Sequence, residues 1–244
     1  MNSSRLGFCF LLYVRVTQRR KLLILLATSS LGLLAVAIYG SREADRINPW
    51  VRVSAQMLAA LGAEYLGYDI ILLIGDSRVA ALGQRDVVQP RTIVFNMGVS
   101  GSTAAQWRTF LEHLRFRFPK AATTVIWLGV NDFIHDAAPA QVVARNLHHL
   151  AVTLNSNGHR VFILDQVALD SKAAPLDKRA NVGSRELNAL FEATPFTAAT
   201  LVRISNMFEQ DASSNLTPLL SDGIHLTSHG NQQVWCRIAT AIFH

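Results

Sequence analysis

Cysteine and charge are both scarce in this chain of 244 residues, and their scarcity excludes several classes of protein. The two cysteines, Cys9 and Cys236, lie near opposite ends of the chain and show no spacing typical of a metal site. Charged residues make up 16% and apolar residues 50%, which excludes an intrinsically disordered chain. The length suits one domain with a sizeable core and one additional segment.

Acidic residues are absent from the first 21 positions, although the chain carries a net charge of +6. Five basic residues lie in that leader: Arg5, Arg15, Arg19, Arg20 and Lys21. The rest of the chain holds 18 basic and 17 acidic residues and is therefore almost neutral. Neither a basic helix nor an aromatic RNA-binding motif accompanies it, so we expect no nucleic-acid partner.

Residues 22–39 form an uninterrupted uncharged stretch of 18 residues, LLILLATSSLGLLAVAIY. As a helix it is just long enough to cross a bilayer core of about 30 Å. With the positive charge in front of it, we expect a cytoplasmic leader (1–21), a transmembrane signal anchor (22–39) and a periplasmic or extracytoplasmic remainder. That topology places the membrane between the two cysteines, which excludes a disulfide between them.

A cleaved signal peptide is the alternative, because Ala35-Val36-Ala37 has the form of a cleavage site. A buried core helix would leave the charge asymmetry unexplained.

After a connector (40–68), which we expect to be partly helical from Pro49, short apolar runs alternate with helical patterns. The runs are typical of strands buried on both faces; they are Asp69–Ile74, Thr92–Phe95, Thr124–Leu128, Arg160–Leu164 and Thr200–Ile204. Apolar residues at helical spacing lie between or after them: Trp107, Leu111 and Leu114; Val143, Leu147, Leu150 and Leu154; and Val234, Ile238 and Ile242. Pro139 lies near the start of the second helix, where its missing N–H costs little. Residues 69–244 therefore predict an α/β domain, with three α/β/α layers around a five-stranded parallel sheet.

Polar clusters follow the first three apolar runs, where the reactive groups of such sheets collect. Ser77 follows the first run, and a serine becomes a nucleophile when a base accepts its proton. The Ser77 and Gly101 N–H groups and the Asn131 amide could stabilise an oxyanion. His225 could be the base, oriented by Asp222 three residues earlier. Each motif alone also fits an ordinary turn or helix cap.

Taken together and in order, these motifs resemble the SGNH/GDSL hydrolase family. Four blocks carry the resemblance: Ile74-Gly75-Asp76-Ser77, Asn96 through Thr103, Gly129-Val130-Asn131-Asp132, and Asp222-Gly223-Ile224-His225. The resemblance implies a flavodoxin-like fold, a Ser77–His225–Asp222 triad, and an oxyanion hole made by Ser77, Gly101 and Asn131. Family members cleave or transfer acyl groups, generally without a metal or organic cofactor. We expect neither here, since His225 and His229 lack the glutamate of zinc helices.

Two positions depart from the family pattern. Arg78 replaces the leucine after the serine, and Val130 replaces a glycine often found before the asparagine. Arg78 could form a structural ion pair or contact an anionic or hydroxylated substrate. Val130 would narrow the adjacent pocket, so both are candidate substrate-binding residues.

These observations predict a serine esterase that removes a small acyl group, such as acetyl, from an envelope or extracellular glycan. Its partners would be the ester substrate and, through the N-terminal helix, the membrane. If a sugar hydroxyl resolved the acyl-enzyme in place of water, the same residues would make an O-acyltransferase. A lysophospholipase or thioesterase, and a catalytically silent glycan-binding domain, remain alternatives.

Overall fold

The computed structural model describes residues 48–83, 89–114, 119–120, 122–167, 175–209 and 224–244. The chain divides into two compact units, residues 1–62 and 63–244. The described part of the first unit lies in helix α2 (Pro49–Tyr65), which begins at the expected Pro49. The side chain of Asn48 caps this helix by accepting a hydrogen bond of 3.0 Å from the Trp50 N–H.

The predicted leader (1–21), the anchor (22–39) and the first part of the connector lie outside the described residues. Among the helices that are described, none is both long enough and apolar enough to cross a membrane.

The second unit contains a sheet of five parallel strands in the order β2-β1-β3-β4-β5. The strands are β1 (Asp69–Gly75), β2 (Thr92–Asn96), β3 (Thr123–Trp127), β4 (Arg160–Leu164) and β5 (Thr200–Val202). This confirms the predicted parallel sheet. The first strand, β1, lies inside the sheet. The second strand, β2, pairs with one side of β1, and the third, β3, pairs with its other side. The carboxyl ends of β1 and β3 therefore flank the switch point at which such sheets bind ligands.

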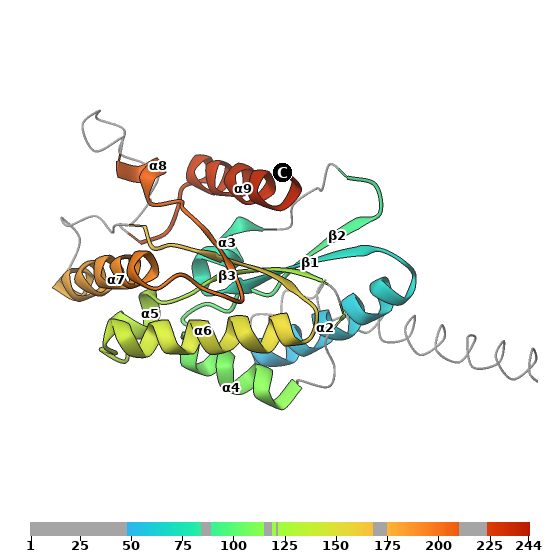
Figure 1. Ribbon diagram of the computed structural model, residues 1–244, viewed down its shortest axis with the longest axis horizontal. Coiled ribbons are helices and arrows are strands. Elements are labelled where there is room, and N and C mark those ends of the chain that lie inside the picture. The colour runs from blue at the N-terminus through green and yellow to red at the C-terminus, as the bar shows by residue number, and fades with distance from the viewer. Residues whose placement is uncertain (1–47, 84–88, 115–118, 121, 168–174, 210–223) are drawn as a thin grey trace, which may run out of the picture. The chain divides into compact units, whose positions relative to one another are not determined.

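Helices cover both faces of the sheet (Figure 1). Helices α3 (Ser77–Leu82) and α9 (Ser228–Phe243) lie on one face, where Val79, Leu82, Val234 and Ile238 join the core. Helices α4 (Ala104–Leu114), α6 (Ala140–Ser156) and α7 (Pro175–Ala193) lie on the other face. Short helices α5 (Val130–Ile134) and α8 (Asn206–Glu209) follow β3 and β5.

Two predicted strands end earlier than their apolar runs, and polar side chains explain both ends. The Leu128 carbonyl accepts a hydrogen bond of 2.8 Å from the side-chain amide of Gln166, so β3 ends at Trp127. One Asp165 carboxylate oxygen accepts the backbone N–H groups of Ile204 and Ser205 at 2.6 and 2.9 Å. These N–H groups are thereby taken out of the strand ladder, and β5 ends at Val202.

Candidate active site

The candidate nucleophile lies on a sharp turn between β1 and α3. Asp76 caps α3 by accepting a hydrogen bond of 2.9 Å from the Arg78 N–H, and Ser77 is the first residue of the helix. The turn requires glycine before the cap: a Cβ on Gly75 would lie 2.0 Å from the Val79 side chain and 2.6 Å from the Trp127 carbonyl oxygen. Ser77 itself is half-buried.

His225 approaches this hydroxyl from the segment that leads into α9. Its Nε2 lies 2.8 Å from the Ser77 Oγ, although the two residues are 148 positions apart in sequence. Thr227 caps α9 two residues later, with its hydroxyl accepting the Gly230 N–H at 3.1 Å. With its proton on Nδ1, the imidazole can accept the serine proton at Nε2. Asp222, the expected partner of Nδ1, lies outside the described residues.

The loop after β2 is bound tightly to the nucleophile turn. The Asn96 amide donates to the carbonyl oxygens of Val79 and Gly83 at 2.8 and 3.0 Å, and its oxygen accepts the Gly98 N–H at 3.0 Å. The Val99 N–H donates to the Gly75 carbonyl at 2.9 Å. These bonds anchor α3 and the loop to one another.

Gly101 follows in this loop at φ 75°, a conformation that favours glycine. It is exposed, and a Cβ built on it would meet nothing within 4 Å. The space beside its backbone is therefore open to a ligand.

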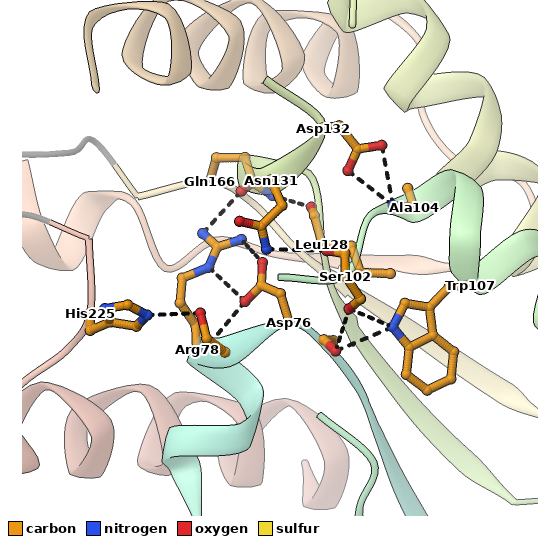
Figure 2. A network of polar contacts seen from close by, with 12 residues as sticks. Asp76, Arg78, Ser102, Ala104, Trp107, Leu128, Asn131, Asp132, Gln166 and His225 are labelled. Carbon is orange, nitrogen blue, oxygen red and sulfur yellow. Dashed lines mark hydrogen bonds and ion pairs between the residues drawn. The ribbon is translucent and has the colours of Figure 1, made fainter. Parts of the chain in front are cut away.

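Asn131 lies on α5, beyond the end of β3, and its side chain turns toward the same loop (Figure 2). Its amide donates to the Ser102 carbonyl at 3.2 Å. The Ser102 hydroxyl donates to the Gly75 carbonyl at 3.2 Å and accepts from the Trp107 indole N–H at 3.0 Å. One hydrogen-bonded network thus joins the polar segments that follow β1, β2 and β3.

Asp132 holds the start of α4 next to this network. Both carboxylate oxygens accept from the Ala104 N–H, at 2.9 and 3.2 Å. The side chain is 2% exposed, and its burial raises the pKa of Asp132 from 3.8 to about 6. Asp132 therefore changes charge at about pH 6, well above the range of an ordinary aspartate.

The comparison with family models is decisive. A model of the "GDSL-like Lipase/Acylhydrolase family" matches residues 74–233, which include every candidate site residue named above. The chain belongs to this family. Hydrolysis of ester bonds is accordingly its reaction class.

Solved structures of two acetyl xylan esterases and of one G-D-S-L protein share the fold. An acetyl xylan esterase, AlAXEase, is 18% identical, with a TM-score of 0.55 over 71% of this chain and 100% of the other. Axe2, an acetylxylan esterase from Geobacillus stearothermophilus, is 16% identical, with a TM-score of 0.55 over 72% and 94%. A lipolytic G-D-S-L protein from Veillonella parvula DSM 2008 has the same identity and TM-score over 72% and 98%. No curated protein matches the chain.

Arg78 and Val130, the two departures from the GDSL pattern, are both 1% exposed. The Arg78 guanidinium binds Asp76 and Gln166 in the interior, and Val130 belongs to the buried side of α5. Neither side chain presents a surface to a substrate in this structure. The expectation that they contact substrate stays a prediction, while the structure places both side chains in the interior.

Several residues that support the site have no family motif to identify them. Gln166, two residues beyond β4, reaches Arg78 and the end of β3; Trp127 is the last residue of β3 and packs against Arg78. Position in the sequence is a signal for Gln166. Asp165 and Gln166 directly follow the fourth apolar run, just as the other site motifs follow the first three runs.

Proposed function

We propose that this GDSL protein is a serine esterase in which Ser77 is the nucleophile, His225 the general base and Asp222 the residue that orients His225. The observation that carries the proposal is the contact of 2.8 Å between the His225 Nε2 and the Ser77 Oγ. This distance allows direct proton transfer. The contact lies beyond the carboxyl ends of the strands, beside the switch point between β1 and β3.

The proposed reaction has two steps. His225 takes the Ser77 proton as the oxygen attacks the ester carbonyl, and the resulting imidazolium then protonates the leaving alcohol. The Ser77 and Gly101 N–H groups and the Asn131 amide stabilise the oxyanion, and each such donor contributes about 2.7–4 kcal/mol. Water, activated by His225, then attacks the acyl-serine and releases the acid.

We further propose acetyl groups on a glycan as the substrate. Two similar structures are described as acetyl xylan esterases, which supports this substrate class. The predicted anchor at 22–39 would hold the domain outside the cytoplasmic membrane, where envelope polysaccharides are present. Carbonate washing of membranes and protease treatment of intact cells test this location: a retained anchor predicts a membrane-bound chain that external protease cleaves.

A second candidate, a lysophospholipase or thioesterase, is favoured by an apolar hollow of about 380 Å³ between α5, the start of α6 and α7. Phe133, Pro139 and Val182 line it, and Phe133 lies two residues after Asn131 on α5. A hollow of this kind could hold a longer acyl chain.

The deciding experiment measures hydrolysis of p-nitrophenyl acetate, butyrate and octanoate by the full chain. Ser77→Ala is the test variant, and Ser156→Ala, an exposed serine at the end of α6, is the matched control. We expect turnover on acetate that disappears only in Ser77→Ala. Turnover that survives in Ser77→Ala would exclude this nucleophile, and rates that rise with chain length would favour the second candidate. Transfer of acetyl to an added sugar, in place of acetate release, would identify an acyltransferase.

A further inference from the structure

The most unusual side chain in the second unit is Arg78, an arginine buried directly beside the candidate nucleophile. It is 1% exposed, and burial of a charged group is costly unless it is paired and hydrogen-bonded. Its Nε and Nη2 donate to the two carboxylate oxygens of Asp76 at 3.1 and 2.9 Å. This bidentate pairing satisfies the geometry of both groups.

The same guanidinium extends across the switch point of the sheet (Figure 2). Its Nη1 donates to the Gln166 side-chain oxygen at 3.1 Å, and its central carbon lies 4.5 Å from the centre of the Trp127 ring. The Gln166 amide in turn donates to the Leu128 carbonyl at 2.8 Å. The Gln166 backbone exchanges two hydrogen bonds of 2.8 Å with the Asn188 side chain of α7. Arg78 therefore connects the nucleophile turn after β1 to the ends of β3 and β4.

A leucine at this position, as in the family pattern, could fill space but could form none of these bonds. A lysine would keep the charge but lose the planar fork that binds Asp76 and Gln166 together. The turn in this chain is therefore held by polar contacts that only arginine can form simultaneously. Without Arg78, the Asp76 carboxylate, which is 0% exposed, would also be left buried one residue from Ser77 without its counter-charge.

We propose that Arg78 is a positioning residue for the esterase reaction. Its contacts connect the Asp76–Ser77 turn to the ends of β3 and β4 and so hold Ser77 in place for attack. The inference rests on the proposed function, because it assumes that Ser77 is the nucleophile. Arg78 acts through Asp76 and the backbone of the turn and does not contact the substrate.

The test compares Arg78→Lys, Arg78→Leu and Gln166→Met in the full chain. We measure kcat and KM on p-nitrophenyl acetate and the rate of Ser77 labelling by a fluorophosphonate probe. Displacement of a reacting group by about 1 Å can cost 100-fold in rate, so we expect a kcat loss of about 100-fold for Arg78→Leu. We expect about tenfold for Arg78→Lys and Gln166→Met, which keep part of the network. KM should remain nearly constant, and labelling should slow in parallel with kcat.

Two controls separate positioning from general loss of stability. Thr124→Val removes a buried hydrogen bond of 2.8 Å to His159 near the amino end of the central strand β3, away from Ser77 at the carboxyl end of β1. It should therefore lower the melting temperature without lowering kcat. Arg160→Leu removes another arginine that packs on an aromatic ring, Phe162, at the start of β4. If Arg78→Leu fails to fold, Gln166→Met and Arg78→Lys carry the test.

Each outcome distinguishes this inference from the proposed function. Turnover and labelling that depend on Ser77 but are unchanged in the Arg78 and Gln166 variants overturn the positioning role alone. A fall in kcat no larger than in Thr124→Val at equal loss of stability also overturns it. Absence of Ser77-dependent turnover and labelling in the unaltered protein overturns the proposed function and this inference together.

Discussion

The side-chain amide of Asn131 donates a hydrogen bond of 3.2 Å to the backbone carbonyl of Ser102, the residue after Gly101. This bond fixes one candidate oxyanion donor relative to the loop that carries another. The next residue on α5, Asp132, accepts the N–H of Ala104, the first residue of α4 directly after the same loop. Two adjacent side chains of a one-turn helix therefore hold the end of the loop, at Ser102 and at the start of α4. The donors can thus be aligned before a substrate binds.

Asn131→Ala should lower kcat by about 100- to 1,000-fold, because it removes an oxyanion donor and a contact that aligns the loop. KM should change little, since the ground-state carbonyl gains less from this donor than the oxyanion does. Steady-state kinetics on p-nitrophenyl acetate measure both constants. Asn155→Ala, an exposed asparagine at the end of α6, is the control and should keep its kcat. An equal kcat in the two variants would remove Asn131 from the oxyanion hole.

Gly98→Ala and Gly101→Ala should differ in their effect on folding, although both change a glycine of the same loop. A Cβ on Gly98 would lie 2.2 Å from the backbone nitrogen of Ala80 in α3, where nothing flexible can move aside. A Cβ on Gly101 has open space and meets only the strain of its φ of 75°, about 1 kcal/mol. Urea unfolding should therefore show a loss of several kcal/mol for Gly98→Ala and a much smaller one for Gly101→Ala. Equal losses would contradict the packing of this loop on α3.

Asp132 should make the protein more stable as the pH falls from about 6 to about 4. Burial raises its folded-state pKa from 3.8 to about 6, so in this range the folded chain holds a proton that the unfolded chain has released. The contribution is complete below the unfolded pKa and is lost as the pH rises through about 6; it amounts to roughly 3 kcal/mol. Asp132→Asn has no such proton. Urea unfolding at pH 4, 5, 6 and 7 should show that the difference in free energy of unfolding between the unaltered protein and Asp132→Asn changes over this window. A constant difference would contradict the raised pKa of Asp132.

His159 should have the opposite effect on stability. Its ring is buried, with Nε2 2.7 Å from the Pro119 carbonyl and Nδ1 2.8 Å from the Thr124 hydroxyl. Burial lowers the pKa of His159 below its ordinary value of 6.5. The contribution of His159 to the free energy of unfolding is therefore complete above pH 6.5. It is lost as the pH falls, because the unfolded chain takes up a proton on this histidine before the folded chain does. His159→Gln should show a weaker loss of stability below pH 6.5, measured by the same unfolding series. An unchanged slope would exclude the buried imidazole as the source.

Sequence reasoning predicted the sheet well because the information is local. Strands such as β1 are continuous apolar runs that must be buried on both faces, and any fold that buries them shows the same pattern. Helix α7 escaped prediction for the same reason. Its buried positions include the small or polar residues Ala180, Asn181 and Ser184, so few large apolar residues mark its buried face in the sequence.

The sequence by itself determined the order of the strands along the chain, the polar motifs at their ends and, through those motifs, the family. Tertiary structure decided which of these groups meet. Ser77 and His225 are 148 residues apart, and Arg78 and Gln166 are 88 residues apart. Local sequence cannot specify such pairs, because a side chain's partner depends on which strands become neighbours. The order β2-β1-β3-β4-β5 brings the ends of β1, β3 and β4 together, and that arrangement turns a charged residue beside the nucleophile into part of the interior.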